Sequence, residues 1–231
     1  MNVLITGANR GLGLEFARQY AQAGWQVHAC CRDPGHAREL QDLAAQSGGS
    51  VSLHALDVAD AGQITRLAAE LASQPVDLLL NNAGVYPDAR HSSMAAPTDE
   101  AWILGYRVNV IAPLKMALAF APHLAHSRRK LVVNISSKMG SMGDNSSGGS
   151  YLYRSSKAAL NAISKSLAVD LAPQGITVLV LHPGWVVTDM GGPNALISPA
   201  ESVAGMRQVI EQAGPHLSGC FIDYAGKAVP W

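Results

Sequence analysis

Two side chains in the second half of the chain, Tyr153 and Lys157, could together transfer a proton. They are four residues apart, and on a helix this spacing places them on the same face. A free tyrosine titrates near pH ~10, which is too high for ready proton exchange at neutral pH. A neighbouring ammonium group stabilises the phenolate and lowers that pKa. We therefore expect the pair to protonate an alkoxide, or to deprotonate an alcohol in the reverse direction.

A hydroxyl group and an amide group upstream could complete such a site. Ser137 could donate a hydrogen bond to a substrate oxygen and stabilise the charge that builds there. Its neighbour Ser136 could do the same, and both residues could instead be turn-forming hydroxyls. Asn109 lies inside a predicted helix, where asparagine is unfavourable. It indicates either a functional role or a local distortion of the helix.

A glycine-rich turn near the start of the chain could bind phosphate. Gly7, Gly11 and Gly13 directly follow the apolar strand Val3–Ile5 and open a helix. Glycine lets the backbone approach a pyrophosphate closely, and the N-terminus of the helix directs unpaired N–H groups at that anion. An ordinary tight turn is the alternative, but the order of strand, turn and helix favours a nucleotide site.

The residues after the second predicted strand indicate which dinucleotide this turn selects. An acidic residue at that strand end would bind the ribose diol of NAD. Cys31 holds this place, Arg32 follows it, and Arg10 in the glycine turn adds a second guanidinium group. Two guanidinium groups favour the extra phosphate of NADP. Asp33 could pair with Arg32 or bind the diol itself, but the pattern predicts NADP rather than NAD.

The elements that must position these residues alternate between short apolar strands and helices. The predicted strands are Val3–Thr6, Gln26–Cys31, Val51–Ala55, Val76–Asn81, Lys130–Ile135, Thr177–His182 and Gly219–Ile222. The predicted helices are Leu12–Ala23, Ala37–Gln46, Gly62–Ser73, Asp99–His123, Tyr151–Leu171 and Ala200–Gln212.

This alternation predicts a doubly wound α/β fold of the Rossmann type, with a mainly seven-stranded parallel sheet and helices on both faces. Asp60 and Ser198 are expected to cap helix starts, and Gly24 and Gly175 to follow helix ends. We found no internal repeat and no linker, so residues 1–231 are expected to form a single dinucleotide-binding and catalytic domain.

Two prolines interrupt the fourth predicted helix. Pro113 and Pro122 lie within it and are expected to bend or end it.

A loop over residues 140–149 follows the fifth predicted strand. In open α/β sheets, such a loop lies at the carboxyl ends of the strands, where ligands bind.

Composition excludes several classes of protein. The formal net charge is zero, which argues against nucleic-acid and anionic membrane partners. A strand that begins at Asn2 leaves no room for a signal peptide, and no apolar run approaches the ~20 residues that span a bilayer. Three cysteines indicate buried thiols rather than disulfides, and hence a cytoplasmic protein. His123 and His126 are too few ligands for a metal site, so no metal is expected.

Six motifs along the chain together resemble the short-chain dehydrogenase/reductase family, in its compact single-domain branch. The resemblance covers nearly the whole chain. The sequence around Tyr153 is similar to that of the C-factor and carbonyl reductase-like members. The motifs are Thr6-Gly-Ala-Asn-Arg-Gly-Leu-Gly13, Asp57, Asn81-Asn-Ala-Gly84 with Asn109, Asn134-Ile-Ser-Ser137, Tyr153-Arg-Ser-Ser-Lys157, and Pro183-Gly184 with Thr188.

The resemblance implies an NADPH-dependent oxidoreductase that transfers a hydride between nicotinamide and a carbonyl or alcohol substrate. Asn109, Ser137, Tyr153 and Lys157 would be its catalytic residues. Ser137 is chosen over Ser136 because the family uses the second serine of this pair. Asn109 would hold a water that links Lys157 to solvent, and Lys157 would also hold the nicotinamide ribose.

The resemblance also implies how the cofactor lies. Asp57 would meet the adenine with Val58 beside it, and Asn82 and Gly84 would line the path of the adenosine and ribose. Thr188 would lie near the nicotinamide carboxamide or the phosphates. The full set of expected cofactor-binding residues is Gly7, Asn9, Arg10, Gly11, Leu12, Gly13, Arg32, Asp57, Val58, Asn82, Ala83, Gly84, Tyr153, Lys157, Pro183, Gly184, Val186 and Thr188.

The function, the oligomeric state and the substrate stay open at this level. C-factor is associated with intercellular signalling, so a nucleotide-binding signalling protein with incidental turnover is the alternative to an enzyme, and epimerisation is a weaker one. The family commonly assembles through the fourth and fifth helices, which implies a homodimer or homotetramer. The loop between Ser137 and Tyr153 is longer than is common in the family, and its Met139 and Met142 could line an adaptable apolar pocket. The substrate itself is not identified.

Overall fold

The computed structural model describes residues 1–90 and 98–231. Its strands are β1 (Asn2–Thr6), β2 (Gln26–Cys31), β3 (Val51–Ala55), β4 (Leu78–Asn81), β5 (Leu131–Ile135), β6 (Thr177–His182) and β7 (Phe221–Asp223). Its α-helices are α1 (Gly11–Gln22), α2 (Arg38–Gln46), α3 (Ala61–Glu70), α4 (Asp99–Tyr106), α5 (Ala112–Ala125), α6 (Tyr151–Asp170) and α7 (Pro199–Gln212). The strands predicted from the sequence are all present, with ends shifted by no more than two residues.

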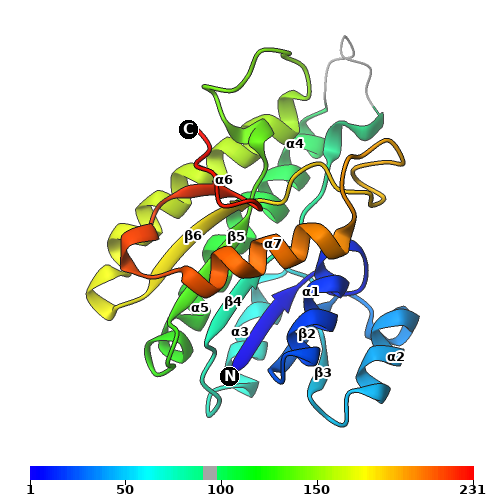
Figure 1. The fold of residues 1–231 in the computed structure, drawn as a ribbon, viewed down its shortest axis with the longest axis vertical. Helices are drawn as coiled ribbons and strands as arrows, with labels where there is room; N and C mark the ends of the chain where they lie inside the picture. The colour runs from blue at the N-terminus through cyan, green and yellow to red at the C-terminus, as the bar shows by residue number, and fades with distance from the viewer. Residues whose placement is uncertain (91–97) are drawn as a thin grey trace.

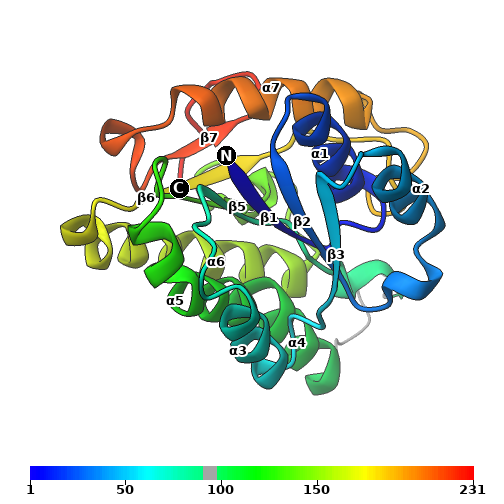
Figure 2. The same cartoon turned by 90° about the horizontal axis from the view of Figure 1, so that it is seen from below.

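The strands form one parallel sheet in the order β3-β2-β1-β4-β5-β6-β7 (Figure 1). After β3 the chain crosses back from the edge of the sheet, so that β4 pairs with β1. Seen along the sheet, α1, α2 and α7 cover one face, and α3, α4, α5 and α6 cover the other (Figure 2). The predicted Rossmann-type fold is confirmed.

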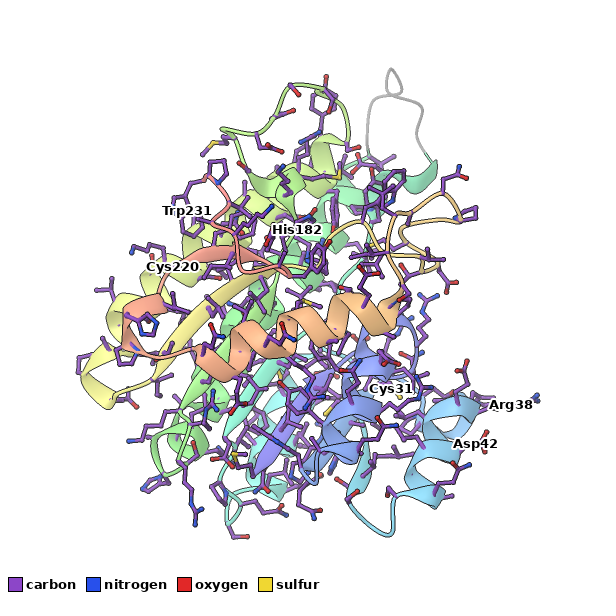
Figure 3. The ribbon with its side chains drawn as sticks, in the orientation of Figure 1. Cys31, Arg38, Asp42, His182, Cys220 and Trp231 are labelled. Atoms are coloured by element: carbon purple, nitrogen blue, oxygen red, sulfur yellow. The ribbon has the colours of Figure 1, made fainter. Side chains whose placement is uncertain are left out.

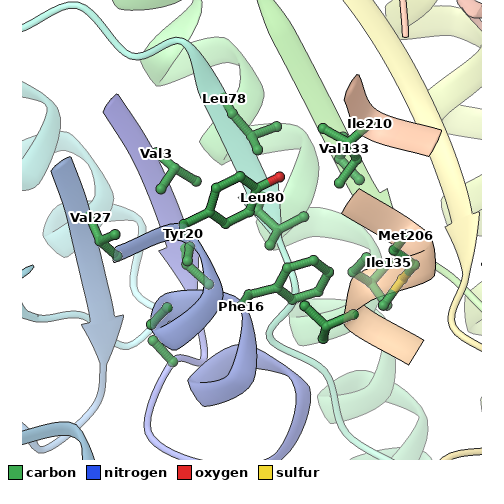
Figure 4. Close-up of a cluster of buried hydrophobic side chains, with 14 of the residues drawn as sticks. Val3, Phe16, Tyr20, Val27, Leu78, Leu80, Val133, Ile135, Met206 and Ile210 are labelled. Carbon is green, nitrogen blue, oxygen red and sulfur yellow. The ribbon is translucent and has the colours of Figure 1, made fainter. Parts of the chain in front are cut away.

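Alternation along the strands explains the two cores. Successive strand residues point to opposite faces. Leu78 and Leu80 of β4 therefore join the core under α1 and α7, while Leu79 joins the core under α3, α5 and α6. In the first core, Phe16 and Tyr20 from α1 pack with the strands and with α7 (Figure 4). Both faces of the sheet are buried, which is why the strands are continuous apolar runs.

The predicted helix boundaries are confirmed where a side-chain cap or a glycine defines them. Asp60 accepts the backbone N–H groups of Gly62 and Gln63 at 2.8 and 3.2 Å, and Ser198 caps α7 through the N–H of Glu201. Gly24 and Gly175, which follow helical segments, have φ angles of +77° and +73°. Both angles lie in the left-handed region, where glycine is favoured.

The prediction that Pro113 and Pro122 end the fourth helix is wrong, whereas a bend at either residue stays a prediction. The helical run continues from Asp99 to Ala125, with Pro122 inside α5. Pro113 lies in the first turn of α5, directly after a π-helical turn. The irregularity lies earlier, in a π-helical turn, η3 (Arg107–Ile111). By length and composition this run is apolar enough to cross a membrane, but 56% of its most apolar window is buried inside the protein, as in the core helix of a globular fold.

Candidate active site

The glycine turn between β1 and α1 leaves no room for a side chain at Gly7 or Gly13. Gly7 has a φ angle of +67°, and a Cβ atom there would lie 2.9 Å from the Cα of Ala83. At Gly13 a Cβ would lie 2.1 Å from the carbonyl oxygen of Gly7 and 2.6 Å from the Nδ2 of Asn82. Only glycine allows β1, α1 and the loop after β4 to pack this closely.

Asn82 and Thr6 join this turn to the end of β4. The Nδ2 of Asn82 donates to the carbonyl oxygens of Thr6 and Gly7 at 2.9 and 3.1 Å. The Oγ1 of Thr6 accepts the backbone N–H groups of Asn82 and Ala83, both at 3.0 Å. Sequence reasoning assigned no role to Thr6, although it stands in the quoted motif at the end of β1.

The loop after β6 closes the turn from the other side. A Cβ on Gly11 would lie 3.5 Å from the Cγ2 of Thr188, so these two predicted cofactor residues are neighbours. Gly184 has a φ angle of +84°, and Val186 forms a β-bridge with Ile197. Pro183 precedes this loop at the end of β6. In the same region Arg10 forms an ion pair with Asp189, so Arg10 is already partnered.

The strand ends at β2 and β3 hold the residues predicted to choose the cofactor. Cys31 is buried at the end of β2 (Figure 3), and Arg32 after it is exposed. Asp33 pairs with His36 at 2.6 Å rather than with Arg32. Within the described parts of the chain Arg32 forms no ion pair. Asp57 follows β3 and accepts the N–H of Ala59 at 2.9 Å.

These features fit the pyrophosphate of a dinucleotide. Among the described residues, no side chain caps the N-terminus of α1, and the first turn of that helix carries no acidic residue. Asn9 and Arg10 of the turn are exposed, whereas Leu12 packs partly against the core. A helix N-terminus without an anion of its own, next to a turn that only glycine can form, suits a phosphate group.

Tyr153 and Ser137 lie together at the start of α6 and the end of β5. Both are almost fully buried. Burial raises the pKa of Tyr153 to about 12, and a side-chain hydrogen bond with Ser137 opposes this rise in part. The prediction that a nearby cation lowers the pKa of the phenol is therefore wrong here, because burial desolvates the phenolate and raises that pKa.

The ammonium group of Lys157 is hydrogen-bonded to the backbone and lies over the ring of Tyr153. Its Nζ donates to the carbonyl oxygen of Ile135 at 2.9 Å and lies 5.7 Å from the centre of the Tyr153 ring. Burial lowers the pKa of Lys157 to about 8. Gly84 stands beside it: a Cβ there would lie 3.6 Å from this Nζ and 3.4 Å from the Oδ1 of Asn109.

Asn109 occupies the π-helical turn η3 and is completely buried. Its Oδ1 accepts the N–H of Val85, and its Nδ2 donates to the carbonyl of Val85, both at 2.9 Å, and to the Oγ of Ser156 at 3.0 Å. The helix distortion and the predicted functional position therefore coincide at Asn109, and π-bulges often lie at functional sites. A water relay through Asn109 stays a prediction.

The two serines after β5 face different partners. Ser136 donates to the Oδ1 of Asn161 on α6 at 2.6 Å, whereas Ser137 contacts Tyr153. The geometry thus separates a serine that ties the sheet to α6 from a serine that contacts Tyr153.

A buried polar network supports this corner and was missed from the sequence. Asn81 donates to Asn134 at 2.8 Å, and Asn134 donates to Ser164 at 2.8 Å, which links β4, β5 and α6. Asn81 and Asn134 are register partners in the sheet. The available signal was a polar residue at the same place in two apolar strands.

The C-terminal residue Trp231 contacts the loop between β5 and α6. The carbonyl oxygen of Trp231 accepts the N–H of Gly143 at 2.8 Å, and the Trp231 ring lies 5.6 Å from that of Phe221. His182 at the end of β6 accepts the N–H of Lys138 at 3.2 Å (Figure 3). Within residues 1–90 and 98–231, no three metal-binding side chains gather in a way that could hold an ion.

A family profile described as short chain dehydrogenase matches residues 1–195, and the chain belongs to this family of oxidoreductases. The chain is 41% identical to C-signal of Myxococcus xanthus over 170 residues, which cover 71% of this chain and 98% of that protein. Two solved structures superpose over its whole length. The carbonyl reductase Sniffer of D. melanogaster has a TM-score of 0.92 at 34% identity over 99% of its chain. An NADPH-bound carbonyl reductase from chicken fatty liver has a TM-score of 0.91 at 37% identity over 98% of its chain.

Proposed function

We propose that the protein is an NADPH-dependent carbonyl reductase in which Tyr153 is the general acid, and the general base for alcohol oxidation. The observation that carries this proposal is the meeting of Tyr153, Ser137 and Lys157 at the carboxyl ends of β4 and β5, beside a turn that fits a dinucleotide. NADPH, when bound, supplies the hydride. Gly7, Gly11, Gly13 and the other residues named above would hold it.

The raised pKa of Tyr153 suits the reductive direction. With a pKa of about 12, the phenol stays protonated at neutral pH. This is the form that can protonate an alkoxide, which is a stronger base than phenolate. Ser137 would donate a hydrogen bond to the same substrate oxygen. Lys157, charged below its pKa of about 8, would favour the negative charge that Tyr153 acquires.

The experiment is a panel of aldehydes, ketones and quinones followed by the loss of NADPH absorbance, with NADH in parallel. We expect oxidation of NADPH with at least one class of carbonyl and none above background for a Tyr153→Phe variant. Turnover by Tyr153→Phe at the wild-type rate would overturn the role of the phenol. No turnover by the wild type across the panel would overturn the enzyme proposal.

Preference for NADP over NAD is proposed to depend on Arg32. It is exposed at the end of β2 and unpaired within the described chain, whereas Arg10 already contacts Asp189. The chicken carbonyl reductase named above is bound to NADPH. Loss of a charge-assisted hydrogen bond is worth roughly tenfold or more in affinity. Arg32→Ala should therefore raise the KM for NADPH about tenfold and leave that for NADH unchanged; an equal change for both would contradict this assignment.

A nucleotide-binding signalling protein is the second candidate, because of the similarity to C-signal. It predicts NADPH binding without turnover above that of Tyr153→Phe. Binding can be measured by the fluorescence of NADPH, so the same samples separate the two candidates.

We further propose a cytoplasmic homodimer or homotetramer that forms through α4, α5 and α6. Leu104, Ile111 and Leu118 are spaced by seven residues along the α4–α5 run and are 50%, 43% and 55% exposed. An apolar row of this kind is typical of a helix that packs on another copy. Sedimentation of only monomer at micromolar concentration would contradict this proposal.

A further inference from the structure

The helix that carries Tyr153 begins without a cap of its own. Ser150, the residue before α6, has a left-handed backbone with a φ angle of +47°. Its side chain makes no capping hydrogen bond, and the first turn of α6 holds no acidic residue. The first N–H groups of a helix have no partner within it and are costly to bury unsatisfied. The amides of Leu152 and Tyr153 therefore need a partner from elsewhere.

Asp88 provides that partner from a different part of the chain. It lies in a short 3₁₀ turn, η2 (Pro87–Arg90), which follows the loop after β4. Its Oδ2 accepts the N–H of Tyr153 at 2.7 Å, and its Oδ1 accepts the N–H of Leu152 at 3.3 Å. These are the two positions that an N-cap side chain normally satisfies, and a carboxylate there also complements the helix dipole.

Tyr86 adds two contacts to the same place. Its hydroxyl group is hydrogen-bonded to the Oγ of Ser150 at 2.7 Å, and its ring centre lies 4.6 Å from that of Tyr153. One residue earlier, the backbone of Val85 holds the side chain of Asn109. A single short segment therefore contacts the start of α6 at residues 150, 152 and 153, and the π-helical turn at Asn109.

We propose that Asp88 is a positioning residue for Tyr153, with Tyr86 as its partner, and that this clamp sets where the phenol stands relative to Ser137 and the substrate oxygen. The inference rests on the proposed reductase function. Asp88 touches neither of the reacting groups: it acts through the backbone of Tyr153. Because a displacement of about 1 Å of a catalytic group can cost up to about 100-fold in rate, a lost cap at this helix should be visible in turnover.

Asp88→Ala and Asp88→Asn test the clamp as a pair. Asparagine keeps a side-chain oxygen that can accept one of the two N–H groups, and it ranks with aspartate as a cap. We expect Asp88→Ala to lower kcat by about tenfold or more, and Asp88→Asn to restore it to within about threefold of wild type. The Kd for NADPH should change much less than kcat in both, since Asp88 contacts no residue of the glycine turn.

Asp60→Ala is the matched control. Asp60 caps α3 through two backbone N–H groups, as Asp88 caps α6. The Asp60→Ala variant should lower the Tm as Asp88→Ala does. Its kcat, calculated per molecule that binds NADPH, should equal that of the wild type. A fall in kcat of equal size in Asp60→Ala and Asp88→Ala would overturn the positioning role.

Two further readouts are independent of overall stability. In a Tyr153→Phe background Asp88→Ala should lower the residual rate no further, because both changes act on one group; an additive loss would overturn the proposal. Hydrogen exchange at the amides of Leu152 and Tyr153 should be faster in Asp88→Ala and unchanged in Asp60→Ala. Unchanged exchange at these two amides would overturn the clamp, whereas a wild-type protein without carbonyl turnover would overturn the proposed function instead.

Discussion

The glycine turn and the Tyr153 corner, which we define as Tyr153, Ser137 and Lys157 with the polar side chains that support them, lie at the same edge of the sheet. The two regions are built in different ways. The turn is made of backbone from residues close in sequence, and its constraint is the space that Gly7 and Gly13 leave. The corner is made of side chains from four separate segments, with buried groups whose pKa values are shifted. The difference indicates that changes in the turn should alter binding of the dinucleotide, whereas changes in the corner should alter the rate.

After Tyr153→Phe, the largest effect is expected in the corner for Ser137→Ala. Loss of one hydrogen-bond donor to a developing oxyanion typically costs about 100- to 1,000-fold in kcat, and NADPH affinity should be retained. Ser136→Ala is the matched control, because its hydroxyl donates to Asn161 instead. Steady-state rates and NADPH fluorescence would check both variants. A larger loss of kcat in Ser136→Ala than in Ser137→Ala would reverse our assignment of the two serines.

The next effect is expected in the turn, for Gly13→Val. Its Cβ would lie 2.1 Å from the carbonyl oxygen of Gly7, so the turn must move and the Kd for NADPH should rise by about 30-fold or more. Gly24→Ala is the control: it strains a residue with a φ angle of +77° in open space, far from the site, and should lower the Tm alone. Unchanged NADPH binding in Gly13→Val would contradict our interpretation of the turn.

A third effect is expected from pH. The reductive kcat/KM should fall about tenfold per pH unit above about 8, because Lys157 then loses its proton. Unfolding does not explain this fall. The lowered pKa of Lys157 means that the unfolded chain binds more protons between about pH 8 and the ordinary lysine value, so the contribution of Lys157 to stability rises with pH in that window. A flat profile from pH 7 to 10 would contradict the role of the ammonium group.

The last prediction concerns the stability of the sheet at β2 and β3, not the activity. His28 on β2 is buried, and its Nδ1 lies 3.2 Å from the Nε2 of His54. Burial lowers the pKa of His28 to about 4. As pH falls from about 6.5 to 4, the unfolded chain binds a proton that the folded protein does not. The free energy of unfolding should drop by up to about 3 kcal/mol. Between pH 7 and 4.5, urea unfolding should show a smaller decrease in the free energy of unfolding for His28→Gln than for the wild type. An equal decrease in both proteins would contradict the role of His28.

Local rules predicted most of the fold. The apolar runs, the caps at Asp60 and Ser198, and the glycines after helices each depend on neighbours in sequence, and each is confirmed. Pro122 does not end α5, which continues to Ala125 with Phe120, His123 and Leu124 buried beside it.

The candidate site was predictable in its residues but not in its energetics. Six motifs place Tyr153, Ser137 and Lys157 on elements that meet at one edge of the sheet. Burial of the phenol, which decides its pKa, depends on the whole structure and cannot be read from a spacing of four residues. Asp88 carries no sequence signal either, because the helix that it caps begins more than sixty residues later.

The return of the chain from β3 to the far side of β1 has a consequence for synthesis on the ribosome. Strands β1, β2 and β3 pair with one another in sequence order and can associate while the rest is still being translated. The other edge of β1 stays open until β4 emerges and docks there. We expect nascent chains that stop before residue 78 to be bound by chaperones at this uncovered apolar edge, since unpaired strand edges of incomplete folds are prone to aggregate.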